Sequence, residues 1–467
     1  MHVFTIPAEK WDESNPDKEA IRHLILKHRS GVGRLIELKK YYEGKHKILS
    51  DKDRENKLVC NHAKDISDTA SSYFIGNPVA YKSKADIQIL TEALENAGAD
   101  EVDGDNGLDL SIYGRAYEYI YTKQDETELS IKNLPPENTF LVYDDTIEQN
   151  ELFGVYYYAR KDDTDRANTV YVATVLTKNY KYVLNIQDVD GPQALLEEPE
   201  AHFKNEVPII EYLNNKLAIG DYELQIPLID AYNALMSDRI TDKEQFIDSI
   251  LAIYGALLSD EDAEMEGDGE GSQKAMKRLK KEKLVEFPEG AKAEYLTRTY
   301  DEAGVEILKK AIEQDIHKFS HIPCMSDESF GGNVSGVAME FKLLGMENIT
   351  KIKTRYYKKG LRKRLRIFAN FLNTRSGISV DVTCITPTFS RAMPKNLLEI
   401  SQYVANLWGK VSKKTLLSQI PFVEDPDEEL KAVEKEEQEN LQKQKELFWN
   451  QPNEPPEEGG GLDDDEE

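Results

Sequence analysis

Apolar residues recur every three or four positions in the first hundred residues, a spacing typical of helices with one buried face. Residues 17–42 carry such a stripe and predict a helical segment that ends at the sequence YYEGKH. Residues 52–99 predict further helix, interrupted where Gly76-Asn77-Pro78 demands a turn. Residues 113–186 change to short runs rich in Tyr, Val and Thr, separated by turn residues. This second pattern predicts strands, so we expect a β-rich α+β domain.

Helical spacing returns at Leu228 and keeps one apolar stripe over 228–257. An acidic, Gly-rich insert follows, and then KLVEFPEGAKAEYLTR (283–298), which predicts a hairpin around Pro288–Gly290. Residues 301–322 predict a second helix. A third and longest helix is predicted for 335–372.

The apolar stripe of the longest predicted helix changes phase at one glycine. The stripe runs through Ile349, Ile352 and Tyr356 and resumes five residues later at Leu361. Because a glycine is a position where a long helix can bend, we predict a kink at Gly360. The sequence ISVDVTCITPTF (378–389) predicts a returning strand, and 393–421 with 427–448 predict a helical C-terminal unit.

Composition restricts the class of protein. The 467 residues are 40% hydrophobic and 31% charged, and no run of about 18 apolar residues is present, so we expect a globular chain without a membrane span. The N-terminus lacks the basic start and apolar core of a secretory signal. Cys60, Cys324 and Cys384 are isolated and odd in number, which predicts neither a disulfide framework nor a zinc site.

The net charge of −27 argues at first sight against nucleic-acid binding, but its distribution matters more. Residues 424–467 hold 18 Asp and Glu against 4 Lys, a net −14, so about half of the excess lies in the last tenth of the chain. By composition, 451–467 is predicted to be a disordered acidic tail. A solubilising end and a partner-binding segment are both open for it.

Searches for catalytic chemistry give little. No P-loop sequence is present, and GVGRLIELKK (31–40) follows a helical pattern rather than the strand that a dinucleotide site requires. His317 and His321 have the spacing of zinc ligands, but the intervening Lys318-Phe319-Ser320 lacks the Glu of a metalloprotease motif. We therefore predict no catalytic residues, no metal site and no cofactor.

One basic stretch stands out on the longest predicted helix. Nine cations lie between 351 and 366 with no acid among them: Lys351, Lys353, Arg355, Lys358, Lys359, Arg362, Lys363, Arg364 and Arg366. Such a surface can contact phosphates or pair with carboxylates of a neighbouring subunit. In a chain this acidic we favour intersubunit pairing, for which the candidates are Lys351, Lys353, Arg355, Lys358, Lys359, Arg362 and Lys363.

A second candidate is the loop between the second and third of these helices. It is polar and acidic, has a single aromatic residue, and contains two glycines that give backbone freedom: Ser326, Asp327, Glu328, Ser329, Phe330, Gly331, Gly332 and Asn333. Because a helix connection in a compact bundle needs few residues, the loop is either slack or functional.

Taken in order, several motifs resemble the portal protein of tailed double-stranded DNA bacteriophages of the long-tailed type. The resemblance covers about 17–440 and rests on YYEGKHKIL (41–49), NHAKDISDTASSYFIGNPVAY (61–81), SIYGRAYEYIY (111–121), VPIIEYLNNK (207–216), LIDAYNALMSD (228–238), MSDESFGGNVSGVAMEFKL (325–343) and FSRAMPKNLLE (389–399).

The resemblance implies a mainly helical α+β portal fold divided along the chain. Its parts would be a wing (1–227), stem helix 1 (228–257), a clip insert (258–299), stem helix 2 (300–322), a tunnel loop (323–335), a long kinked helix with a wing return strand (336–392), a crown (393–450) and the acidic tail (451–467).

The resemblance also implies function and partners. About twelve copies would form a ring at one capsid vertex, with a channel through which double-stranded DNA is packaged and ejected. The loop 326–333 would project into the channel, where Asp327 and Glu328 repel phosphates and prevent DNA from sticking. Expected partners are the terminase large subunit, a head-tail connector or adaptor, and the major capsid and scaffold proteins. The protein would reside in the virion after assembly in the host cytoplasm.

Two other classes of function stay open on the residues alone. The first is a DNA-packaging enzyme, which an ATPase assay would reveal, although the missing P-loop counts against it. The second is a monomeric head-assembly adaptor that binds partners through its acidic tail. A measurement of particle size separates a monomer from a ring.

Overall fold

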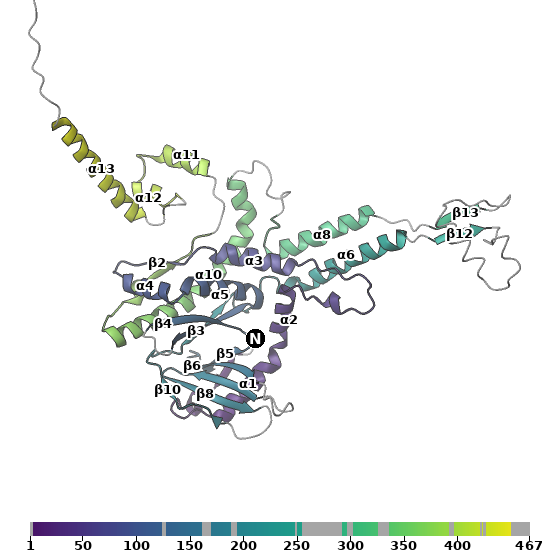
Figure 1. Cartoon of the computed structure of the whole chain (residues 1–467), viewed down its shortest axis with the longest axis horizontal. Helices are drawn as coiled ribbons and strands as arrows, with labels where there is room; N and C mark the ends of the chain where they lie inside the picture. Colours follow the sequence, from purple (N-terminus) through teal and green to yellow (C-terminus); the bar gives the residue numbers. More distant parts are fainter. Residues whose placement is uncertain are drawn as a thin grey trace, which may run out of the picture. The chain divides into compact units, whose positions relative to one another are not determined.

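The structure, a computed structural model, describes residues 3–123, 128–160, 170–187, 194–247, 250–254, 292–296, 302–325, 336–391, 397–420, 423 and 426–449. The chain divides into two units (Figure 1). The first unit comprises Met1–Gly331 and Phe341–Ala392, and the second comprises Gly332–Glu340 and Met393–Glu467. Helices and strands are mixed in the first unit, which confirms the predicted α+β class.

The first unit contains a seven-stranded sheet. Its order is β1 (Phe4–Ile6), β5 (Thr139–Asp144), β6 (Glu151–Arg160), β7 (Val170–Leu176), β8 (Tyr180–Gln187) and β10 (Glu200–Ala201), with β9 (Ala194–Leu195) also paired to β8. Among the described strand pairs of this sheet, β1–β5 is parallel and the others are antiparallel. Helix α1 (Lys18–Gly31) buries Ile21 and Ile25 against sheet residues that include Phe140 and Phe153. Of the strands predicted within 113–186, those at 139–144, 151–160, 170–176 and 180–187 are confirmed in this sheet.

A second layer is built on a three-stranded antiparallel sheet of order β11 (Ile209–Leu213), β3 (Arg115–Thr122) and β4 (Leu129–Leu134). Around its core lie α3 (His62–Ile75), α4 (Gln88–Asn96), α5 (Ala99–Tyr113) and the 41-residue α10 (Gly336–Ser376). Helix α2 (Gly33–Tyr42) contacts α3 and α5. Short 3-10 turns occur at Ala8–Lys10, Lys47–Ser50, Glu223–Gln225 and Val382–Cys384.

Local chemistry explains where several helices begin and end. The Asp17 carboxylate accepts the backbone N–H groups of Glu19 and Ala20 at the start of α1, and Asn61 caps α3 in the same way through Lys64 N–H. Helix α5 ends at Gly114, whose φ of +78° lies in the left-handed region. A Cβ at Gly114 would also lie 2.2 Å from the Ala218 carbonyl oxygen, so only glycine fits this turn.

Helix α6 (Ile226–Ile247) is shorter than predicted. The helical prediction for 228–257 is wrong at Ile250–Tyr254, which forms strand β12 and pairs antiparallel with β13 (Lys292–Leu296), while 248–249 and 255–257 lie outside the described residues. The apolar run ILAIY contains β-branched and aromatic residues and fits both periods, so spacing alone could not decide between helix and strand. Helix α8 (Glu302–Ser320) agrees with the helix predicted for 301–322.

The strand predicted for 378–389 is reduced to β14 (Thr386–Thr388), which pairs antiparallel with β2 (Ala80–Lys82). The residues before it form a 3-10 turn in which the Asp381 carboxylate accepts the Thr383 N–H. An acid that bonds its own backbone two residues ahead favours a turn over a ladder, which explains the interruption.

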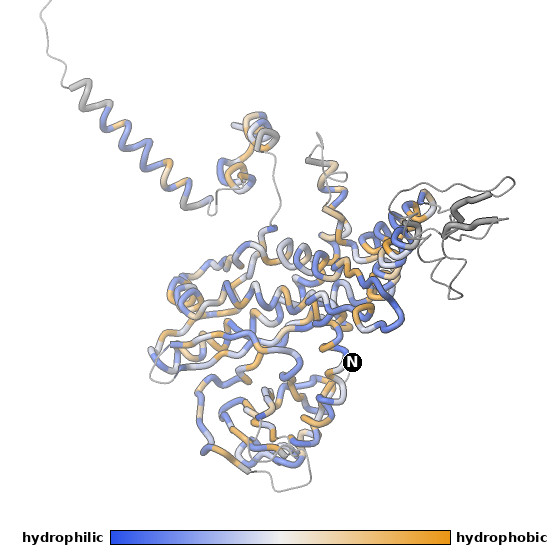
Figure 2. Tube along the Cα trace, turned by 45° about the vertical axis from the view of Figure 1, so that its right-hand side comes forward, coloured by the Kyte–Doolittle hydropathy of each residue, from blue (hydrophilic) through white to orange (hydrophobic). Residues whose placement is uncertain are grey.

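The second unit contains α11 (Leu397–Leu407), α12 (Lys413–Leu417) and α13 (Pro426–Trp449), in agreement with the predicted helical C-terminal unit. Figure 2 shows the described middle part of α13 as mostly hydrophilic. A largely polar helix gains little from burial in its own chain.

We expect Asp109→Asn to stabilise the protein at pH 8. Burial raises the pKa of the Asp109 carboxyl to about 7, opposed by the hydrogen bond from Asn133 and reinforced by Glu137. The folded state therefore binds more protons than the unfolded state between about pH 4 and 7, and stability falls as pH rises through this window. An amide stays neutral, so the variant should gain about 1–3 kcal/mol at pH 8 and almost nothing near pH 4.

Urea unfolding of both proteins at several pH values measures this difference. Asp53→Asn, in an exposed loop, is the matched control and should change stability little at any pH. A constant difference between Asp109→Asn and the parent from pH 4 to 8 would contradict the assignment.

Candidate functional site

Helices α6 and α8 run side by side in opposite directions (Figure 1). The Arg239 guanidinium on α6 pairs with Glu302 and, at 2.9 Å, with Glu306 on α8. Lys243 adds a contact of 3.5 Å to Glu302. These partly exposed pairs fix the register of the two helices more than they stabilise the fold. The far end of the pair is connected through β12 and β13, because α6 leads into β12 and β13 leads into α8.

The C-terminal end of α8 is held firmly. The Ile322 side chain is buried, and its carbonyl oxygen lies 3.1 Å from His317 Nδ1. A Cβ at Gly345 of α10 would lie 3.5 Å from His321 Nδ1, so α10 passes close to this end of α8. The predicted loop, Ser326, Asp327, Glu328, Ser329, Phe330, Gly331, Gly332 and Asn333, lies outside the described residues. The structure describes α8 and the residues up to Met325 before it, and α10 from Gly336 after it.

The two histidines with the spacing of zinc ligands, His317 and His321, have different surroundings. The His317 ring is buried edge-on against His62, and His321 lies beside Gly345. Burial lowers the pKa of His62, and the neighbouring His317 lowers it further. In the part of the chain that the structure describes, no group of three or more His, Cys, Asp and Glu side chains is arranged to hold a metal ion.

The basic stretch of α10 is divided between the interior and the surface. Lys353 is buried and pairs with Asp221 at 2.7 Å, while Lys363 is buried against Glu151 and donates to the Ile209 carbonyl oxygen at 2.7 Å. These two lysines bind within the subunit, so they leave the set predicted for intersubunit pairing. Sequence alone could not separate them from the other cations, since it does not show which carboxylates approach the helix.

The other members of the set are at least partly accessible. Lys351 lies 3.7 Å from Glu347 one turn away, and the half-buried Lys358 ammonium lies 5.8 Å from the centre of the Phe389 ring. Arg355, Lys359 and Arg362 are exposed. None of these last three makes an ion pair with any other described residue. Their intersubunit role stays a prediction.

Arg364 is the most buried cation of the basic stretch. The sequence alone did not distinguish it from the other cations of that stretch. It is fully buried and binds both oxygens of Asp103, at 2.6 and 3.1 Å, and Glu118 Oε1 at 2.9 Å. Burial alone would lower the pKa of this guanidinium, but Asp103 and Glu118 hold it well above its ordinary value. The cluster joins α5, β3 and α10 at the centre of the second layer.

Neutral donors complete this cluster. Glu118 Oε2 accepts from Tyr212 OH at 3.0 Å and from Asn106 Nδ2 at 3.1 Å, and Asp103 Oδ1 accepts from Tyr357 OH at 2.5 Å. The sequence contains one indication of this cluster. Glu118 lies within the apolar and aromatic strand RAYEYIYT, where it is buried, and a buried carboxylate requires a cation.

Gly360 lies over an aromatic ring. A Cβ at this position would lie 2.3 Å from Tyr212 Cε1 and 2.5 Å from Cδ1. The helix is continuous through Gly360, and close approach to Tyr212 gives this glycine a reason that does not require a bend. The predicted kink stays a prediction.

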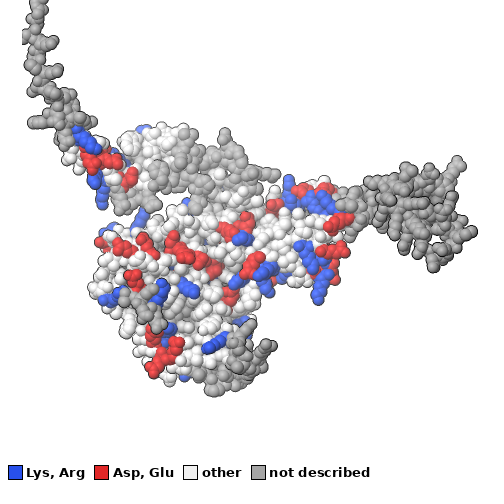
Figure 3. Space-filling model, in the orientation of Figure 1, with Lys and Arg blue, Asp and Glu red and all other residues white. Residues whose placement is uncertain are grey.

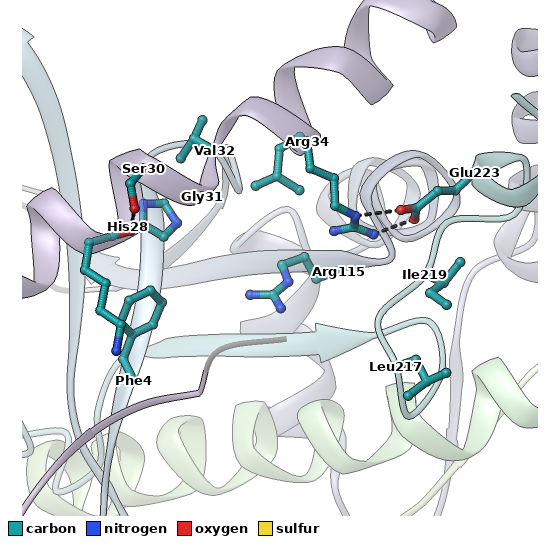
Figure 4. Close-up of a pocket in the computed structure, with 12 residues that line it drawn as sticks. Phe4, His28, Ser30, Gly31, Val32, Arg34, Arg115, Leu217, Ile219 and Glu223 are labelled. Atoms are coloured by element: carbon teal, nitrogen blue, oxygen red, sulfur yellow. Dashed lines mark hydrogen bonds and ion pairs between the residues drawn. The ribbon is translucent and has the colours of Figure 1, made fainter.

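A pocket of about 560 Å³ lies between α1, α2, the N-terminal strand and the 217–223 segment (Figure 4). Arg34 lines it and is bound to Glu223 through Nε at 2.6 Å and to the Ala218 carbonyl oxygen at 3.0 Å. Burial lowers the pKa of His28 to about 4, and the positive charge of Arg115 contributes to this shift. The ring is therefore neutral at physiological pH. The acid of this pocket, Glu223, is already paired with Arg34, and the Ser30 hydroxyl of the lining donates to the Lys27 carbonyl oxygen rather than to a base.

The model of the family described as "Phage portal protein, SPP1 Gp6-like" matches residues 21–443. The chain belongs to this family of phage portal proteins. The portal protein of Bacillus phage SPP1 is 26% identical over 450 residues, which cover 91% of this chain and 84% of that protein. The portal protein of Clostridium phage phiCD119 is 22% identical over 447 residues, covering 88% of this chain and 94% of that protein.

Solved structures similar to this portal protein include two necks of GTA particles. The neck of the native particle, with C12 symmetry, has a TM-score of 0.43 and 11% identity and covers 77% of this chain and 91% of that chain. The neck of the empty particle, with C6 symmetry, has a TM-score of 0.43 and 10% identity, with 77% and 90% covered.

Membership of the family confirms the resemblance inferred from the sequence motifs. The protein acts at the portal vertex of the phage capsid, a role that implies passage of DNA during packaging and ejection. The family is one of structural channel proteins rather than enzymes, which disfavours the packaging-enzyme alternative. None of the described helices is both long enough and apolar enough to cross a bilayer.

Proposed function

We propose that about twelve copies of this portal protein assemble in the host cytoplasm into a ring whose channel is lined by α6 and α8. In the virion, the insert 258–299 faces outward and binds the terminase large subunit and later the head-tail connector. Residues 393–450 face the interior of the head. The ring contacts the major capsid and scaffold proteins around it.

The observation that carries this proposal is the antiparallel α6–α8 pair. An insert that leaves and re-enters through paired strands at one end of two helices can project from that end as a separate docking element. At the other end α8 is followed by 321–325 and then by 326–335, the segment that we propose enters the channel. Two helices with distinct elements at their two ends suit a channel wall that meets different partners at its two mouths.

The surface of α8 supports an assembled state. Ile307 and Leu308 are 71% and 50% exposed, and Phe319 is 55% exposed. These three side chains offer apolar surface that a neighbouring subunit could cover. In a ring, each α6–α8 pair has such a neighbour on both sides.

The channel role proposed for 326–333 rests on the chemistry of these residues and on how the residues before them are held. Its acids repel phosphates, and Gly331-Gly332 gives the freedom to follow a polymer that does not share the symmetry of the ring. The residues just before it are held in place, because the Ile322 side chain is buried and its carbonyl oxygen lies 3.1 Å from His317 Nδ1.

Deletion of Phe330–Asn333 is expected to leave ring formation nearly unchanged and to impair DNA packaging severely. A ring of about twelve 53.3-kDa chains exceeds about half a megadalton, so mass measurement counts rings directly. Packaged genome per head, measured for the same variant, reports the function of the loop. A buried, structural loop predicts the reverse order of damage, because loss of a buried Phe typically removes about 3–5 kcal/mol.

The matched pair of point variants is Phe330→Ala and Phe203→Ala. Phe203 is 65% exposed in the wing and should affect neither measurement. Lost rings in the deletion variant would make the loop structural, and normally filled heads would make it slack. A parent protein that stays monomeric would overturn the ring itself.

A further inference from the structure

Helix α10 presents a row of cations that no described residue of its own subunit neutralises. Arg355, Lys359 and Arg362 follow one another at intervals of four and three residues, which places them on one face of the helix. All three are exposed, and the residues that the structure describes supply no carboxylate within ion-pair distance of them. Their charges are therefore available to another molecule.

Helices α4 and α5 present the opposite charge. The exposed acids on these helices are Glu92, Glu95, Asp100, Glu101 and Asp105, and Figure 3 shows acidic side chains gathered over both helices. No ion pair joins any of the five to another described residue. Burial and the nearby Glu101 raise the pKa of Asp105, as expected where like charges lie together without a cation.

The two charged faces point away from each other. Asp103 of α5 faces α10, where it binds Arg364 and Tyr357. Glu101 and Asp105 lie two positions from Asp103 and therefore on the far side of α5, since each residue turns the helix by about 100°.

The same reasoning applies to α10. Its residues Tyr357, Leu361, Leu365 and Phe368 enter the core shared with α4 and α5, so the face of Arg355, Lys359 and Arg362 turns away from that core. One subunit thus carries acid on one side of this core and base on the other.

We propose that the acidic α4–α5 face of one subunit docks on the basic α10 face of the next subunit in the ring. This inference rests on the ring of the proposed function and names the surfaces that close it. A ring built head to tail needs two different surfaces that complement each other on every copy, and opposite charges on opposite sides provide them. Electrostatic complementarity also fixes the register between neighbours.

Apolar surface lies beside the basic face and gives the interface a dry centre. Ile349, Ile352 and Tyr356 of α10 line a groove of about 420 Å³ with Leu217 and Leu224. Leu217, Leu224 and Ile352 are all exposed in the single subunit. An interface with an apolar core and a charged rim is the usual anatomy of a protein contact.

Charge reversal on full-length protein tests the pairing. The basic-face variant carries Arg355→Glu, Lys359→Glu and Arg362→Glu, and the acidic-face variant carries Glu95→Lys, Glu101→Lys and Asp105→Lys. Each alone should reduce the fraction of protein in rings at least about tenfold at about 100 mM salt, because like charges then meet at every contact. The chain that carries all six changes should form rings again. An equal mixture of the two single-face variants should also form rings, since each supplies the face that the other lacks.

A matched control carries Lys10→Glu, Lys40→Glu and Lys52→Glu, the same change of charge on exposed lysines outside α10. It should form rings as the parent does. Circular dichroism checks that each variant is folded. The milder set Arg355→Gln, Lys359→Gln and Arg362→Gln serves if reversal prevents folding, and its rings should dissociate at lower salt than those of the parent.

Four results would overturn the inference. First, the variants changed on one face could form rings normally. Second, the chain with all six changes and the mixture of the two variants could both stay monomeric. The basic-face variant could form normal rings while losing affinity for a duplex DNA oligonucleotide, which would make the α10 face a DNA contact. A parent that forms no ring would remove the proposed function and this inference together, whereas the first three results leave the ring itself standing.

Discussion

Replacement of Arg364 by alanine is expected to destabilise the protein by about 3–5 kcal/mol, because it leaves two buried carboxylates without a cation. Asp103 and Glu118 are both essentially inaccessible to water, so solvent cannot replace the guanidinium. Denaturant unfolding measured by circular dichroism gives the loss directly. Arg366→Ala is the matched control: the same residue type, two positions away, paired with Glu206 at 2.6 Å on the surface. It should lose less than about 1 kcal/mol.

A neutral version of the cluster separates charge from packing. Arg364→Met combined with Asp103→Asn and Glu118→Gln removes the charges and keeps groups that can accept from Tyr357 and Tyr212. This triple variant should recover much of the stability lost in Arg364→Ala. If Arg364→Ala unfolds at the denaturant concentration of the parent, the cluster does not hold the layers together.

The second large effect is expected from Gly360→Ala, at about 1–3 kcal/mol of destabilisation by overpacking. Alanine favours a helix over glycine by about 1 kcal/mol, so a loss in this direction identifies a steric cause. The Tyr212 ring cannot move away easily, because it stacks on Tyr357 with centroids 4.3 Å apart and donates to Glu118. Thermal and denaturant unfolding measure the change.

Gly345→Ala is the control for this prediction. It lies in the same helix, and its new Cβ would meet no described atom nearer than 3.5 Å, so it should stabilise slightly. In a Tyr212→Ala background the loss from Gly360→Ala should disappear. If the loss persists there, a bend in α10 at Gly360, rather than contact with Tyr212, explains the glycine.

Periodicity predicted the helices well, and it failed where a short apolar run fits two structures. The stripe of α10 was recognisable because it persists for more than five turns, from Ile349 to Phe368, whereas Ile250–Tyr254 is a five-residue run whose pairing partner lies about forty residues later. Strand pairing at that distance is a tertiary property. Local spacing contains no information about it.

The basic stretch shows the same limit for side chains. The sequence displays nine cations on one helix but not which carboxylates approach them. Lys353 and Lys363 became internal because Asp221 and Glu151 are brought to α10 by distant elements. Phase along the helix could have distinguished Arg364 from Arg366, since the former lies in line with Leu361 and Phe368. The motif order, in contrast, was sufficient to recognise the family.

The Arg364 cluster has a consequence for how the chain is made. Arg364 follows Asp103 by 261 positions and Glu118 by 246, so both acids leave the ribosome long before their cation. At about 5–20 residues per second, the delay is on the order of ten to fifty seconds. During this interval the second layer lacks the charge that its centre requires and cannot close. The helix that ends the delay also carries the face proposed to meet the next subunit, so a nascent chain becomes competent to assemble only when its synthesis is nearly complete.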